Sequence, residues 1–154
     1  MNISPIVKTL VWPDEAATAA YATQLAAALT RADLNACIAL HGDLGAGKTT
    51  WVRHLLRALG VEGRIKSPTY AVVEPYTVAV GEVWHFDFYR FSDPREWEDA
   101  GFRDIFASQG LKLCEWPQNA AGVMPMPDLE LHIQVDEEDH RHVRITAPVS
   151  YTHL

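Results

Sequence analysis

Hydrophobic and polar positions along the chain first predict strands. Apolar runs too short for helices occur at residues 6–11, 37–40 and 111–114, and the last two are typical of buried parallel strands. Apolar and polar residues alternate over residues 129–135 and again around Val143 and Ile145, which predicts half-exposed antiparallel strands on either side of a turn. The pattern therefore predicts a sheet with both parallel and antiparallel parts.

The remaining pattern predicts helices and one hairpin. Helices are expected at residues 14–30, 49–59, 93–100 and 104–108. Gly60 is suited to end the second helix, and Asp93, Pro94 and Glu96 form a capping box at the start of the third. Two extended runs, 70–76 and 82–87, resemble a β-hairpin. Strands and helices alternating in this way predict an α/β fold.

Between a buried strand and a helix lies the stretch 42–49, which matches the phosphate-loop pattern G-x-x-x-x-G-K-[ST]. Its glycines let backbone N–H groups turn toward phosphate oxygens, and the N-terminus of the following helix attracts the same anion. Lys48 is expected to reach the β- and γ-phosphates, Thr49 to bind Mg²⁺, and Thr50 to donate to an α-phosphate oxygen. The expected nucleotide-binding residues are Asp43, Leu44, Gly45, Ala46, Gly47, Lys48, Thr49 and Thr50.

With this motif, the fold is predicted to be a three-layer α/β fold of the P-loop NTPase type. Its central sheet is expected to be mostly parallel, with antiparallel hairpin additions. The expected ligands are ATP or ADP with Mg²⁺. The whole chain, 1–154, is predicted to be one domain, with 150–154 as a disordered or uninformative tail.

Acidic residues at the ends of two predicted strands are candidates for the metal and for catalysis. Asp87 follows one strand and Glu115 the other, and either is suited to hold Mg²⁺ through water, with Thr49 as the hydroxyl ligand. Thr69, after Pro68, is a candidate γ-phosphate sensor. Lys48, Asp87 and Thr69 are thus the candidate catalytic residues. For each carboxylate the alternative is a solvated strand end, and for Thr69 it is a turn before a strand.

Several neighbouring side chains have two open interpretations. His85 has the same strand parity as Asp87, so it faces the site or is a structural histidine. Arg90 stabilises transition-state charge or forms a surface salt bridge. Trp116 walls the nucleotide pocket or packs in the core.

Three other histidines were also considered as metal ligands. His132, His140 and His142 lack metal-ligand spacing on a helix and are assigned no site.

Composition limits the classes of partner. The chain of 154 residues has a formal net charge of −7, which disfavours independent, tight binding to nucleic acid. No run approaches the length of a membrane span, and no signal peptide is evident, so a cytoplasmic location is expected. Cys37 and Cys114 lie in predicted buried strands and are interpreted as small core residues.

Taken together, the motifs resemble those of the TsaE (YjeE) family of bacterial P-loop ATPases. The segments that carry the resemblance are the phosphate loop, Lys66-Ser67-Pro68-Thr69-Tyr70, Val73-Glu74-Pro75-Tyr76, His85-Phe86-Asp87-Phe88-Tyr89-Arg90 and Glu115-Trp116-Pro117. The phosphate loop alone is generic, whereas this combination and order are specific and span about residues 10–135.

The resemblance implies an ATPase required to make N6-threonylcarbamoyladenosine beside the anticodon of tRNAs that read codons starting with A. It implies action with the TsaB–TsaD heterodimer after TsaC has made threonylcarbamoyl-adenylate. The small size of the chain, its acidic balance and the aromatics beside Asp87 further predict slow turnover alone and contact with tRNA only through the partners. It also implies that Thr49 and Glu115 lie at the Mg²⁺, that Asp87 lies in a switch-like element, and that the Ser-Pro-Thr segment is another switch. The region 86–91 and the helix after it would lie near the partner surface.

Three other functions compete with this interpretation. A small-molecule P-loop kinase would need an arginine-rich lid and an acceptor pocket, for which the chain has little length. A GTP-driven switch would need the guanine-reading pattern Asn-Lys-x-Asp, which the sequence lacks. A nucleotide-stabilised scaffold would bind nucleotide without meaningful turnover.

Overall fold

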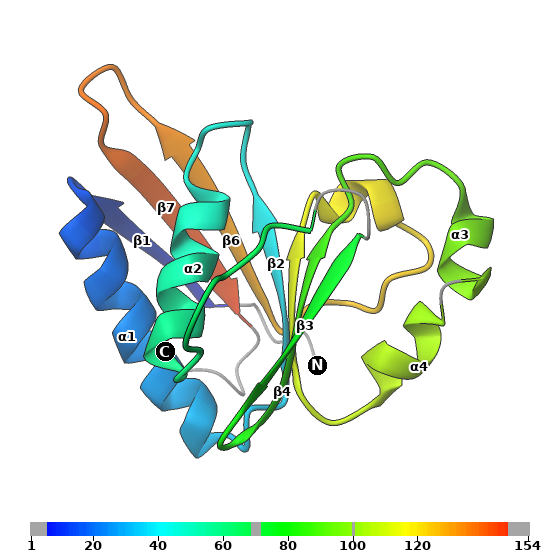
Figure 1. Cartoon of the computed structure of the whole chain (residues 1–154). Coiled ribbons are helices and arrows are strands. Elements are labelled where there is room, and N and C mark those ends of the chain that lie inside the picture. The colour runs from blue at the N-terminus through cyan, green and yellow to red at the C-terminus, as the bar shows by residue number, and fades with distance from the viewer. Residues whose placement is uncertain (1–5, 69–71, 100, 148–154) are drawn as a thin grey trace.

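Seven strands form one mixed sheet in the computed structural model, which describes residues 6–68, 72–99 and 101–147 (Figure 1). The strands are β1 (Ile6–Trp12), β2 (Ala36–His41), β3 (Val73–Val78), β4 (Gly81–Asp87), β5 (Leu111–Glu115), β6 (Leu129–Val135) and β7 (Arg141–Ala147). Their order is β1-β7-β6-β2-β5-β4-β3. The expectations for Thr69 and for the tail 150–154 lie outside the described residues.

The centre of the sheet is parallel and its edges are antiparallel. Strands β6, β2, β5 and β4 run parallel to one another, so their carboxyl ends lie along one edge, at the top of Figure 1. Strand β3 forms the predicted hairpin with β4, while β7 pairs antiparallel with both β6 and β1. This confirms the predicted α/β fold with a parallel core and antiparallel additions.

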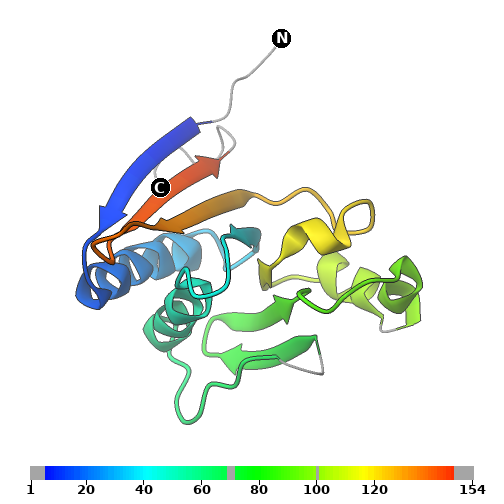
Figure 2. The same cartoon turned by 90° about the horizontal axis from the view of Figure 1, so that it is seen from above.

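Helices lie on both sides of the sheet (Figure 2). One side carries α1 (Glu15–Arg31) and α2 (Lys48–Ala58), and the other carries α3 (Pro94–Asp99), α4 (Phe102–Ala107) and the 3-10 helix η1 (Pro117–Ala120). Each face has its own hydrophobic cluster, which gives the predicted three layers. Among the described residues, no helix has both the length and the apolar character needed to cross a bilayer.

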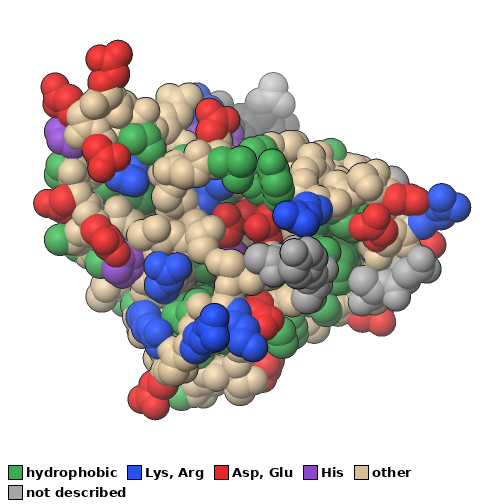
Figure 3. Space-filling model, turned by 45° about the horizontal axis from the view of Figure 1, so that its top comes forward, with side chains coloured by type: hydrophobic (Ala, Val, Ile, Leu, Met, Phe, Trp, Pro, Cys, Tyr) green, Lys and Arg blue, Asp and Glu red, His purple; other side chains and the backbone are tan. Residues whose placement is uncertain are grey.

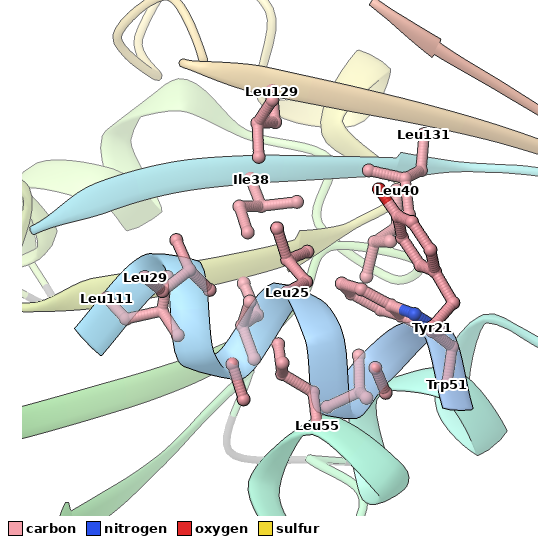
Figure 4. Packing of buried hydrophobic residues seen from close by; sticks show 14 of the residues in the cluster. Tyr21, Leu25, Leu29, Ile38, Leu40, Trp51, Leu55, Leu111, Leu129 and Leu131 are labelled. Carbon is pink, nitrogen blue, oxygen red and sulfur yellow. The ribbon is translucent and has the colours of Figure 1, made fainter. Parts of the chain in front are cut away.

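The larger hydrophobic cluster lies between the sheet and the first pair of helices (Figure 4). Alternate residues of the central strands, such as Ile38 and Leu40, point toward these helices because side chains alternate along a strand. Leu25 and Leu29 of α1, and Leu55 of α2, close over them. This packing fixes α2 against β2, and thereby the loop that joins them.

Aromatic side chains dominate the second cluster. Phe86 and Phe88 are fully buried, and Phe91, Trp97 and Phe102 are at most 5% exposed. Their rings pack edge-to-face or stacked, with the centroids of Phe86 and Phe102 5.2 Å apart. In the region 86–91, which the resemblance places near a partner surface, the three phenylalanines are thus core residues. Tyr89 is the exception, with 47% of its surface exposed.

Local signals set most element ends, but not all. Asp14 is the N-cap of α1, and its Oδ1 accepts from Ala17 N at 2.8 Å. Gly60 has φ 104° just beyond α2, as a C-terminal glycine should. Two features were not predicted: η1, and the parallel pairing of β6 with β2, which alternation alone cannot reveal.

Candidate functional site

The predicted phosphate loop connects the carboxyl end of β2 to the first residue of α2, at the top of Figure 1. Gly42 has φ 154°, and a Cβ there would lie 2.7 Å from the carbonyl oxygen of Ile133. Gly47 caps α2 in the left-handed region with φ 105°, and its carbonyl accepts from Trp51 N. Only glycine suits these two positions, which is why the loop can close around an anion.

Most predicted site residues converge on one cavity of 230 Å³ beside this loop. It is lined by Leu44, Gly45, Gly47, Lys48, Thr49, Thr50, Asp87, Tyr89, Glu115, Trp116 and Arg141. A second cavity of 460 Å³ shares Leu44 and Gly45 and is lined by Gly42–Ala46 and by the end of β6. The predicted residues Asp43 and Ala46 lie on this second cavity. Of all predicted site residues, Thr69 falls outside the described part of the chain.

Lys48 is almost completely buried, with 4% of its surface exposed. Its Nζ donates to the carbonyl oxygen of Gly42 at 2.5 Å and lies 3.8 Å from the centre of the Trp116 ring. Burial lowers the pKa of Lys48, against the opposing effect of Glu115, Asp87 and Asp43. Trp116 therefore covers the lysine and lines the cavity, and it also packs against the second hydrophobic cluster.

Glu115 ends β5 in a buried hydrogen-bond network. His85 Nε2 lies 2.6 Å from Glu115 Oε2, and the two residues are 1% and 3% exposed. The Thr49 hydroxyl donates to the same carboxylate, with oxygen–oxygen distances of 3.1 and 3.2 Å. Within the described part of the chain, His85 Nδ1 has no hydrogen-bond partner, whereas Nε2 is placed to donate to the carboxylate. His85 lines neither cavity beside the phosphate loop, and it contacts the site through the Glu115 carboxylate.

Asp87 ends β4 and is the register partner of Glu115 on β5. Its Oδ1 accepts from Tyr89 N at 3.0 Å. Burial raises the pKa of Asp87 and Glu115 raises it further, while the hydrogen bond from Tyr89 N lowers it. The Tyr89 ring packs 5.0 Å from the Trp116 ring, so the segment after Asp87 touches the residue that covers Lys48.

The oxygen donors at this cavity suit a hard divalent cation. Mg²⁺ prefers a few carboxylate or hydroxyl oxygens and keeps several waters. Thr49 and Glu115 provide such donors within hydrogen-bond distance of each other, and Asp87 lines the same cavity. The residues present therefore fit the ion that the phosphate loop implies.

Arg141, at the start of β7, is a cavity residue that the sequence analysis did not find. A Cβ on Gly47 would lie 3.0 Å from Arg141 Nε, so the guanidinium lies over the phosphate loop. Its Nη1 also donates to the carbonyl oxygen of Asp139. No motif marks this arginine, because it comes from a hairpin almost 100 residues farther along the chain.

The geometry can be compared with known proteins. A family model described as threonylcarbamoyl adenosine biosynthesis protein TsaE matches residues 12–143. The chain belongs to the TsaE family. A TsaE protein of Haemophilus influenzae is 43% identical over 108 residues, covering 70% of this chain and 68% of that protein. A TsaE protein of Bacillus subtilis is 36% identical over 110 residues, covering 71% and 68%.

The fold also matches a solved structure. The crystal structure of Bacillus subtilis YdiB superposes with a TM-score of 0.71 at 30% identity, covering 94% of this chain and 89% of that one. The match includes most of the described structure, so the TsaE-type fold extends over the sheet and both helical layers. The resemblance inferred from the motifs is thereby confirmed.

The raised pKa of Asp87 gives a testable pH dependence for this TsaE-family chain. Because the folded-state pKa lies above the ordinary value of 3.8, the ionised carboxylate destabilises the fold as pH rises through that window. Asp87→Asn should therefore increase the free energy of unfolding at pH 7, and this gain should shrink as pH falls below the raised pKa. Urea unfolding of both proteins between pH 4 and pH 7 measures the difference. A gain that grows toward low pH would contradict the assignment.

Proposed function

We propose that this chain is a Mg²⁺-dependent ATPase that supports N6-threonylcarbamoyladenosine modification of tRNA together with a TsaB–TsaD complex. The main support for this proposal is that Lys48, Thr49, Asp87 and Glu115 line one cavity at the N-terminus of α2. Family membership supports the tRNA modification. We further propose that residues 1–154 work as one domain in the cytoplasm.

The phosphate loop would bind the nucleotide through backbone N–H groups and Lys48. On binding, the lysine ammonium would exchange the carbonyl of Gly42 for the β- and γ-phosphates. Trp116 would keep water from that ammonium. Arg141, beside Gly47, would add a second positive charge at the phosphates.

The metal, when bound, would neutralise charge that develops on the phosphates. Thr49 would hold it directly, and Glu115 would hold it through water, with His85 keeping the carboxylate in place. Asp87 is the proposed group that orients the attacking water or couples the site to the following segment. Thr69 remains a proposed γ-phosphate sensor.

The test of the nucleotide site is Lys48→Ala. Loss of the ammonium should reduce ATP turnover by at least about 100-fold, as for other groups that stabilise transition-state charge. The fold should survive, because burial of this charge does not favour folding. Steady-state phosphate release, with circular dichroism as the folding check, measures this. Near-normal hydrolysis by the variant would refute the site.

A Mg²⁺ titration separates the two carboxylates. In Glu115→Gln the Mg²⁺ concentration for half-maximal turnover should rise by about tenfold or more, the usual effect of losing an outer-sphere partner. The corresponding carboxylate-to-amide substitution on the neighbouring strand is Asp87→Asn. It should lower maximal turnover with little change in the Mg²⁺ requirement. Identical titration curves for the two variants would show that the carboxylates share one role.

Coupling to a partner is proposed to act through Tyr89. Its ring is half exposed and contacts Trp116, while its backbone N–H binds Asp87. A protein that docks on Tyr89 would therefore order Asp87 and the cover over Lys48 together. The chain's net charge of −7 supports indirect contact with tRNA. Acidic side chains are spread over the face that carries the loop, while lysines and arginines gather near its lower edge (Figure 3).

The TsaB–TsaD pair should stimulate phosphate release by the chain, and its affinity should differ between the ATP and ADP states, since coupling between binding sites is reciprocal. Turnover with and without the pair, and pair affinity with each nucleotide, are the measurements. Equal turnover together with equal affinity would sink the proposed partnership while leaving the ATPase assignment standing.

A further inference from the structure

Two histidines and a glutamate meet on the face of the sheet away from α1 and α2, where β2 and β6 lie side by side. His41, the last residue of β2, is the register partner of His132 on β6, and Glu130 lies two residues before His132. The rings of the two histidines are stacked, with centroids 4.3 Å apart and an interplanar angle of 5°. His41 Nε2 lies 3.0 Å from Glu130 Oε1. One ligand atom from each of the three side chains lies within 4.8 Å of the others.

This cluster is separate from the nucleotide cavity. None of its three residues lines either cavity beside the phosphate loop. The neighbouring residues Leu40 and Leu131 point toward α1 and α2 (Figure 4), so the alternate positions point to the opposite face. The side chain of His41 is 26% exposed and that of Glu130 is 39% exposed. The cluster is thus held by rigid strands yet open to solvent.

Two imidazole nitrogens and a carboxylate oxygen are a donor set for zinc and similar ions. We propose that His41, Glu130 and His132 form a binding site for a divalent transition-metal ion such as Zn²⁺. Zn²⁺ binds such ligands at about 2.0–2.2 Å, so tetrahedral ligands lie roughly 3.4 Å apart, and small side-chain rotations bring the three atoms to that spacing. A water completes the fourth position. Mg²⁺ is a poor competitor because it prefers oxygen ligands.

A positive charge beside the cluster allows a substitution that should raise metal affinity, in addition to substitutions of the ligands that should lower it. Arg144 on β7 is the register partner of His132 and points to the same face. The charge of Arg144 opposes a bound cation, so removing it should favour the metal.

His132 lacks the helical spacing of metal ligands, so no site was predicted there. Glu130 and His132 are two residues apart, which brings both to one face of a strand. The third ligand, His41, comes from a strand that lies about 90 residues earlier and pairs in parallel with β6. Only the strand order shows that the three residues are neighbours.

The experiment is a titration of the full chain with Zn²⁺ in nucleotide-free, Mg²⁺-free buffer, with the visible spectrum of Co²⁺ as a second readout of ligand geometry. One equivalent should bind. His41→Gln, His132→Gln and Glu130→Gln should each weaken binding by more than about tenfold, because losing even an outer-shell partner costs about 10–100-fold. Arg144→Gln should strengthen it.

Two controls locate the metal. His142→Gln removes a histidine on the neighbouring strand that is bound to Asp136 at 2.7 Å, and it should leave Zn²⁺ affinity unchanged. Lys48→Ala alters the nucleotide cavity and should also leave it unchanged. The proposal is overturned if no stoichiometric Zn²⁺ binds, if Arg144→Gln weakens binding, or if His142→Gln abolishes binding while His132→Gln does not.

Discussion

The site depends on one buried interaction, the hydrogen bond between His85 and the Glu115 carboxylate. A carboxylate that is only 3% exposed destabilises the fold unless its oxygens accept hydrogen bonds. Here His85 and the Thr49 hydroxyl make those hydrogen bonds. Glu115 and these two partners come from three elements, β5, β4 and the first turn of α2. The parallel register of β4 and β5 therefore has to be correct before the acidic side of the cavity exists.

The aromatic layer on the other face supports that register. Phe86, between His85 and Asp87 on β4, points away from the cavity into the second cluster, where Phe88 and Phe102 pack against it. Alternate residues of the strand therefore point to opposite faces, with His85 and Asp87 toward the cavity side and Phe86 toward the second cluster. Phe88 N also donates to the Glu115 carbonyl, which ties the end of β4 to β5 beyond the regular ladder.

How far the sequence predicts this arrangement depends on how local each signal is. The strand, loop and helix around Lys48 were predictable because glycine conformation, capping and apolar runs are properties of neighbouring residues. Asp87 and Glu115 were predictable as strand ends. Arg141 and His41 were not, because their neighbours are set by strand order, and β6 lies between β7 and β2 for reasons that alternation does not encode. The aromatic segment 86–91 was ambiguous since core and interface use the same residue types.

The buried charges of the site favour the binding of a charged ligand more than they favour folding. Burial lowers the pKa of Lys48 and raises that of Asp87, so the charged form of each group is less favourable in the folded protein than in water. A polyphosphate would bring further negative charge to Lys48, and its divalent cation would offset the repulsion between Asp87 and Glu115. The unfavourable free energy of burying these charges is then offset when the ligand binds. Because the ligand binds only the folded state, it stabilises the fold. Apolar side chains at positions 48 and 87 would make the fold more stable than Lys48 and Asp87 do. The presence of charged side chains there therefore indicates a ligand site at this end of the sheet.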